Sequence, residues 1–83
     1  MTTYERIAFR DGDDGPVRRM YGIVIEDGPM FLHFRPVDKR GDDYSFMREG
    51  RAVVTQRLVS QELIVSRKPC TMNLKYGTLE VTK

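Results

Sequence analysis

Aromatic side chains and the only histidine of the chain gather in one short stretch, MYGIVIEDGPMFLHF, residues 20–34. Alternation within a strand puts Phe31 and His33 on one side, and a turn at Asp27-Gly28 would bring Tyr21 to the same face of a sheet. Aromatic rings exposed on a sheet stack on the bases of single-stranded nucleic acid, each worth roughly 1–3 kcal/mol. This stretch therefore predicts a stacking platform made of Tyr21, Phe31 and His33.

Basic residues flank the stretch on both sides, at Arg18, Arg19, Arg35, Lys39 and Arg40. Lys and Arg side chains that neutralise phosphates make binding depend on salt. The net charge is only +2, divided as −2 in residues 1–49 and +4 in residues 50–83. Dedicated nucleic-acid binders are often more basic, so we expect a local basic patch rather than a field over the whole surface.

Patterns for catalysis or metal binding are missing from the sequence. His33 and Cys70 are each the only residue of their type, which leaves no Ser-His-Asp set, no cysteine zinc site and no internal disulfide. The acidic run DGDDG at 11–15 lacks the spacing and the closing Glu of a calcium-binding EF-hand loop. We expect no enzymatic activity, no cofactor and no metal site.

The length of 83 residues allows one domain, spanning residues 1–83, with one modest core. No apolar run approaches the roughly 20 residues that cross a bilayer. The first ten residues, MTTYERIAFR, lack the apolar region of a signal peptide. These features predict a cytoplasmic protein with no membrane partner.

The apolar pattern repeats every two residues, which is typical of strands. Five strands are predicted, at residues 4–10, 17–25, 30–34, 51–59 and 62–68. Turn-forming segments separate the first three, and a long polar connection precedes the fourth. The remaining residues, 69–83, predict an added hairpin or strand that turns at Tyr76-Gly77, with Met72 and Leu74 facing Leu79 and Val81.

Closure into a small barrel would protect the edges of these short strands. Two architectures compete, a five-stranded OB-type barrel and an SH3-like barrel. A three-strand meander, a long connection and two further strands favour the OB-type order. We expect a barrel core at residues 4–68 and a C-terminal extension at residues 69–83, and a homodimer through the edge of that extension is an open alternative.

The second and third predicted strands resemble the cold-shock domain, an OB-fold family that binds single-stranded RNA and DNA. The family carries a K-G-F-G-F-I type motif on its second strand and V-F-V-H-F on its third, where this chain has RMYGIV at 19–24 and MFLHF at 30–34. The acidic turn IEDGP between them is similar to the family's hairpin. Glu49-Gly50 matches the E-G that precedes the family's fourth strand. The resemblance covers roughly residues 4–68.

The resemblance implies roles for several aromatic residues. Tyr21 is similar to the first aromatic of the second-strand motif, and Tyr44 to an aromatic in the following loop. Phe31, His33 and Phe34 resemble a third-strand trio that stacks on bases. Alternation by itself instead predicts that Phe34 lies in the core.

The match is incomplete on the first two strands. Arg19 stands where the second-strand motif begins with Lys, and Arg18 precedes it. Ile23 replaces the second aromatic of that motif, which removes one stacking surface. Phe9 is the aromatic nearest to the family's first-strand Trp.

Together these features predict binding of single-stranded nucleic acid, RNA in preference to DNA, by a protein of RNA-chaperone or regulatory type. Stacking on the aromatics would be combined with contacts between phosphates and the basic residues, including Lys39 and Arg40. One alternative is a small β-barrel protein-interaction module, encoded by a phage or mobile element, that uses the same face or the Val53–Val65 edge for a partner or a second copy. Another is an SH3-like barrel with no ligand on this sheet.

Overall fold

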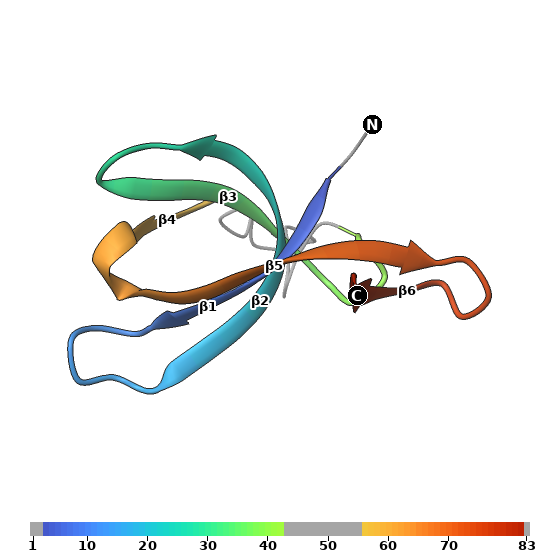
Figure 1. Ribbon diagram of the computed structural model, residues 1–83, viewed down its shortest axis with the longest axis horizontal. Helices are drawn as coiled ribbons and strands as arrows, with labels where there is room; N and C mark the ends of the chain where they lie inside the picture. Colours follow the sequence, from blue (N-terminus) through green and yellow to red (C-terminus); the bar gives the residue numbers. More distant parts are fainter. Residues whose placement is uncertain (1–2, 43–55, 83) are drawn as a thin grey trace, which may run out of the picture.

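A computed structural model describes residues 3–42 and 56–82 of the chain. The all-β class is confirmed, with six strands in the described ranges where five strands and a C-terminal extension were predicted (Figure 1). The elements are β1 (Tyr4–Arg10), β2 (Val17–Asp27), β3 (Phe31–Val37), β4 (Arg57–Ser60), the 3₁₀ helix η1 (Gln61–Leu63), β5 (Ile64–Asn73) and β6 (Thr78–Val81). No helix in the described part of the chain is long and apolar enough to cross a membrane.

Two turns predicted from the sequence are formed. Gly28 N donates to the carbonyl oxygen of Phe31 at 3.0 Å and closes the β2–β3 hairpin without the positive φ that the Asp-Gly pair suggested. Gly77 does adopt a positive φ, 68°, in the turn between β5 and β6, where a residue with a Cβ would be strained.

All six strands form one antiparallel sheet in the order β4-β3-β2-β1-β5-β6. β4 continues the meander beside β3, and β5 returns through η1 to pair with β1. The Greek-key order of an OB barrel would instead put the strand after the three-strand meander beside the first strand. The expected OB-type order is therefore not found among the described strands. The sheet curls toward a barrel but is not closed.

Apolar residues pack on both faces of this curled sheet. The first core lies inside the curl and contains Ile7, Phe9, Leu32, Phe34 and Val59. The second core lies on the outward face, where β5 and β6 meet the end of β3, and contains Val37, Cys70 and Leu79, with Tyr4 and Tyr21 packed against them. Because the sheet uses both faces for packing, only part of its outward face is left for a ligand.

The C-terminal hairpin is continuous with the sheet. The expected boundary between residues 68 and 69 falls inside β5, which runs unbroken from Ile64 to Asn73. Met72 pairs with Leu79 as predicted, and Leu79 is buried in the second core. Leu74, also expected to pack there, lies instead at the tip of a hairpin that projects beyond the rest of the sheet (Figure 1).

Candidate functional site

The aromatic residues proposed as one platform divide into buried and exposed groups. Phe31 and His33 point outward from β3, and 48% of Phe31 is exposed. Phe34 is fully buried, and Phe9 is 2% exposed, with their rings packed edge to face at 6.3 Å. A buried ring offers no face to a base, so Phe9 and Phe34 belong to the first core and not to a stacking surface. For Phe34, strand alternation was the better guide than the family resemblance.

Tyr21 does not lie beside Phe31. In the β2–β3 pair Tyr21 stands opposite Val37, six residues along β3 from Phe31, which corresponds to about 20 Å at the rise of a strand. A hairpin pairs residues that are equally distant from its turn, and Tyr21 is farther from the turn than Phe31. The two rings share the outward face of the sheet but lie toward opposite ends of it.

Gly22 makes room inside the fold rather than for a base. A Cβ at this position would lie 2.6 Å from Cδ2 of Phe34, closer than real Cβ contacts. The glycine therefore lets the Phe34 ring pack against the backbone of β2.

The neighbouring residues Arg18 and Arg19 lie on opposite sides of β2. Arg18 pairs with Phe9 of β1, and its Nη2 lies 3.0 Å from Oδ2 of Asp11. Arg19 pairs with Ala8 and is exposed on the outward face. Of these two arginines, Arg19 is therefore the one available to an anionic ligand on the outward face.

Arg6 occupies the centre of a row that crosses three strands. It stands opposite Tyr21 on β2 and opposite Lys68 on β5. Directly opposed side chains have Cβ atoms about 4.5–5.5 Å apart and share a face. Arg19 lies on the same face, diagonal to Arg6, because its partner Ala8 is two residues further along β1. We call these four residues, Arg6, Arg19, Tyr21 and Lys68, the basic face.

In the described part of the chain, no carboxylate balances the basic face. The outward positions of β1, of β2 from 17 to 23, and of β5 from 66 to 72 include no Asp or Glu. The ion pairs found in residues 3–42 and 56–82 involve neither Arg6, Arg19 nor Lys68. The positive charge of this face is therefore directed to solvent.

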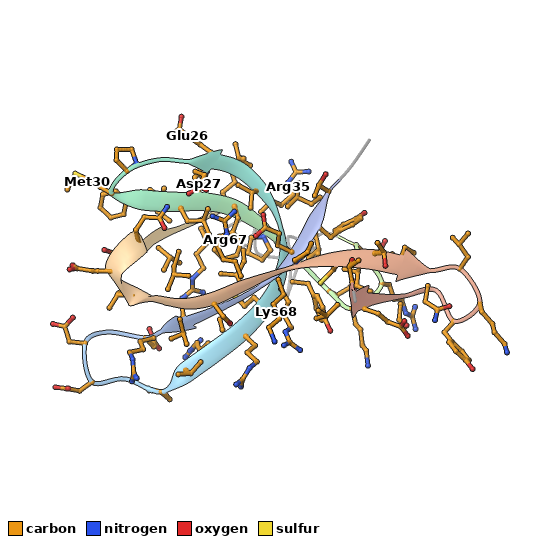
Figure 2. All side chains as sticks on the ribbon, viewed as in Figure 1. Glu26, Asp27, Met30, Arg35, Arg67 and Lys68 are labelled. Carbon is orange, nitrogen blue, oxygen red and sulfur yellow. The ribbon has the colours of Figure 1, made fainter. Side chains whose placement is uncertain are left out.

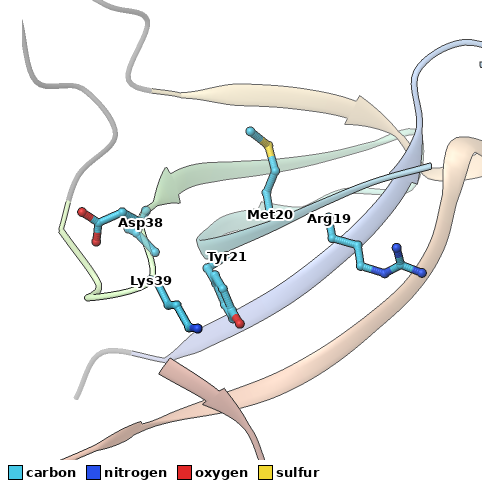
Figure 3. A pocket seen from close by; sticks show the side chains of 6 residues that line it. Arg19, Met20, Tyr21, Asp38 and Lys39 are labelled. Atoms are coloured by element: carbon cyan, nitrogen blue, oxygen red, sulfur yellow. The ribbon is translucent and has the colours of Figure 1, made fainter. Parts of the chain in front are cut away.

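A shallow pocket of about 250 Å³ adjoins the basic face at Tyr21. Its lining consists of Arg19, Met20, Tyr21, Val37, Asp38 and Lys39. The side chains of Tyr21 and Lys39 point in the same direction, and the Asp38 carboxylate points away from them (Figure 3).

The turn after β3 fixes Lys39 beside this pocket. Oδ1 of Asp38 accepts hydrogen bonds from the backbone N–H groups of Arg40 and Asp42, at 2.8 and 2.9 Å. The Lys39 carbonyl accepts one from Leu79 N at 2.7 Å. These bonds hold the backbone of the turn and leave the exposed Lys39 ammonium next to the basic face. Arg40 follows in the same turn and is also exposed.

On the inward face, Arg67 is held by two carboxylates. Arg67 of β5 donates to Glu5 through Nε and Nη2, at 2.8 and 2.9 Å, and to Asp27 through Nη1 at 2.7 Å. Arg67 and Lys68 lie on opposite sides of β5, with Arg67 directed toward Asp27 at the end of the β2–β3 hairpin (Figure 2). The Glu5 carboxylate, by its hydrogen bonds, raises the pKa of Arg67. Arg67 is therefore engaged within the fold, unlike its neighbour Lys68.

Asp27 also ties β2 to η1. Its Oδ1 accepts a hydrogen bond from Gln61 Nε2 at 2.6 Å, and Gln61 Nε2 also reaches the Gly28 carbonyl at 2.9 Å. The hydrogen bond from Arg67, and then that from Gln61, lower the pKa of the Asp27 carboxyl. These contacts connect elements that no strand pairing joins, and they hold the open side of the curl.

The remaining chemistry-bearing residues do not assemble into a site. Nε2 of His33 lies 2.8 Å from Oε1 of Gln56. Burial raises the pKa of the Cys70 thiol, the opposite of what a reactive cysteine needs. No group of three potential metal ligands occurs in the described part of the chain. Tyr44, predicted as a loop aromatic, lies outside the described residues.

Sequence reasoning missed Arg6 and Lys68 as binding candidates. A signal was present in YERIAFR, because the alternation that buries Ile7 and Phe9 turns Arg6 outward. Lys68 carries no such signal, since its place opposite Arg6 depends on a pairing between residues 62 positions apart.

Comparison of the chain with protein-family models, with curated proteins and with solved structures finds no match.

Proposed function

We propose that this protein is a cytoplasmic binder of single-stranded nucleic acid, RNA in preference to DNA. The bound nucleic acid would lie across the basic face. The observation that carries this proposal is the like-charged cross-strand pair of Arg6 and Lys68, with Tyr21 beside it and no carboxylate among the described residues of the basic face. Like charges directly opposite one another in a sheet destabilise it. A bound phosphate between them would remove that repulsion, so a polyanion is the ligand that the face fits best.

Tyr21 supports a single strand over a duplex. Its ring is half-buried against the second core and borders the pocket next to Lys39. An unpaired base can leave the strand and enter such a pocket against the ring, which paired bases in a duplex cannot do without being flipped out. Arg6, Arg19 and Lys68 would then hold phosphates on either side of that base.

The cold-shock resemblance supports the same ligand with different residues. Of the aromatics that it implies, Tyr21 borders the basic face, whereas Phe31 lies about 20 Å and His33 about 13 Å away along the strands. We therefore place the main contact on β1, β2 and β5. The proposed activity is to hold strands unpaired without chemical conversion, as an RNA chaperone does.

A salt titration tests this proposal. Four cations near Tyr21 are available to phosphates, namely Arg6, Arg19, Lys39 and Lys68. For a single strand, each neutralised phosphate contributes about −0.7 to the slope of log K against the logarithm of the salt concentration. Four such contacts therefore predict a slope of about −3. Binding of a labelled mixed-sequence RNA, followed by fluorescence anisotropy from low to moderate salt, measures this slope. Absence of binding at low salt would refute the proposal.

A second candidate function is a protein-interaction module that uses the far end of the sheet. Phe31 and Leu58 lie on the same outward face of β3 and β4 and are 48% and 65% exposed, and Met30 in the adjoining turn is 70% exposed. Exposed apolar side chains that gather in one place are typical of protein contacts. This candidate predicts that Phe31→Ala weakens association with a protein, or with a second copy, and leaves RNA affinity unchanged.

A further inference from the structure

The tip of the β5–β6 hairpin is the most exposed apolar feature of the described residues. Leu74 is 91% exposed and Tyr76 is 68% exposed. The hairpin carries both residues away from the body of the sheet (Figure 1). Neither side chain contributes to either core, so packing within the described part of the chain does not explain why these two positions are apolar.

Hydrogen bonds hold the tip in one conformation. Oδ1 of Asn73 accepts from the N–H groups of Lys75 and Tyr76, at 2.9 and 3.3 Å, and the Asn73 carbonyl accepts from Gly77 N at 2.7 Å. Nδ2 of Asn73 donates to Glu80 at 3.0 Å across the hairpin. A turn ordered in this way presents its side chains with little further loss of entropy on binding.

Tyr76 and Lys75 combine an aromatic ring with a cation. The Lys75 ammonium lies 5.5 Å from the centroid of the Tyr76 ring. One face of the ring is thereby associated with a positive charge, and the other face is open for stacking. Lys75 is the only charged residue in the turn from 73 to 77, so the tip favours an anionic ligand that also offers a flat apolar surface.

The same strand connects the tip to the basic face. β5 carries Lys68 at the basic face and ends at Asn73, which gives about 17 Å of strand between these two residues. We propose that the tip is a second nucleic-acid contact, at which Tyr76 stacks on an unpaired base while Lys75 holds a neighbouring phosphate. This inference rests on the proposed function, since the RNA bound at the basic face would continue along β5 and reach the tip.

The length of the bound strand separates the two contacts. An oligonucleotide of about 4 nucleotides can occupy the basic face alone, whereas one of about 12 can also reach the tip; both lengths lie within the range bound by single small barrels. We expect Tyr76→Ala to weaken binding of the longer RNA by about five-fold or more, the lower end for stacking on one aromatic, and to leave the shorter RNA unaffected. Tyr76→Phe keeps the ring and is expected to bind both RNAs like the wild type.

Each other outcome overturns a defined part of the account. If Tyr76→Ala binds both RNAs like the wild type, the tip is not a nucleic-acid contact, while binding of the shorter RNA still supports the basic face. If sedimentation shows a wild-type dimer that Tyr76→Ala converts to a monomer with unchanged RNA affinity, the tip contacts a second copy. If the wild type binds neither RNA, the proposed function fails and this inference fails with it.

Discussion

Arg6 of β1 and Lys68 of β5 stand directly opposite each other in an antiparallel pair, and the described outward positions next to them carry no carboxylate. Next to them on β5, Arg67 is turned to the other face and is held by Glu5 and Asp27. Among the described residues, Arg67 on the inward face is thus held by carboxylates, whereas Arg6, Arg19 and Lys68 on the outward face have no ion pair. This difference between the two faces, rather than the net charge of +2, is the electrostatic feature that points to a ligand.

Replacing Lys68 should improve stability and impair binding. Lys68→Glu turns a repulsive cross-strand pair into an attractive one, so we expect unfolding to cost about 0.2–1 kcal/mol more than in the wild type. The same change puts a negative charge where a phosphate would lie, so RNA binding should be lost. Lys68→Gln removes the repulsion without adding an attraction and should give an intermediate result for both. Urea denaturation and anisotropy measure the two effects, and a variant that is less stable yet still binds would contradict this interpretation.

Gly22 should tolerate no side chain. A Cβ would meet the buried Phe34 ring at 2.6 Å, so Gly22→Ala should destabilise the fold by about 1–3 kcal/mol, the usual cost of overpacking a core. Because residue 22 faces inward, the folded variant should bind RNA like the wild type at low temperature. Gly12→Ala is the contrasting variant, because nothing lies within 4 Å of the Cβ position of Gly12 and an added methyl group would meet no neighbour. Any loss of stability in that variant would come from the positive φ of 94° at this position. A Gly22→Ala variant as stable as the wild type would show that Phe34 can move aside.

Loss of Arg67 should weaken the contact between β5 and the β2–β3 hairpin. Arg67→Met leaves the half-buried Glu5 carboxylate and Asp27 without their cation, and we expect a loss of about 2 kcal/mol, between the values for exposed and buried ion pairs. Arg18→Met is the matched control, because its pair with Asp11 is exposed and should contribute about 0–1 kcal/mol. Equal losses in the two variants, measured by urea denaturation, would argue against a special role for Arg67.

The same network should appear in the response to acid. Hydrogen bonds from Arg67 and Gln61 lower the pKa of Asp27 in the folded chain, so its charged form is favoured by folding. The stabilisation is therefore complete above the unfolded pKa, about 4, and is lost as the pH falls through the lower folded value. Asp27→Asn removes this contribution, so the difference in stability between wild type and variant should shrink as the pH falls below about 5. A difference that stays constant over this range would mean that the Asp27 charge is not involved.

The class and the hairpins of this fold could be predicted, whereas the strand order could not. Alternation predicts β1, β2 and β3 and correctly assigns Phe34 to the core. The position of a strand and the face to which each of its residues points both depend on neighbouring residues in the sequence. The place of β4 depends on where the chain returns after a long polar connection, and nothing in the local sequence distinguishes the β3 side from the β1 side.

Long-range pairing also explains which candidate binding residues could not be predicted. Tyr21 and Phe31 belong to one hairpin, so their separation could have been worked out by counting residues from its turn. The meeting of Arg6 with Lys68 could not, because it joins two strands from opposite ends of the chain. The candidate site thus contains one aromatic and one arginine that the sequence suggested, together with two cations that only the sheet brings together.

The most direct measurement compares the RNA affinities of Arg18→Gln and Arg19→Gln at low salt. The two variants carry the same substitution at adjacent positions and have the same net charge, but only Arg19 lies on the basic face, whereas Arg18 is paired with Asp11. The account predicts that Arg19→Gln binds more weakly and has a salt slope shallower by about 0.7, while Arg18→Gln binds like the wild type. Equal effects of the two substitutions would contradict it, because binding would then follow net charge and not the face on which the charge lies.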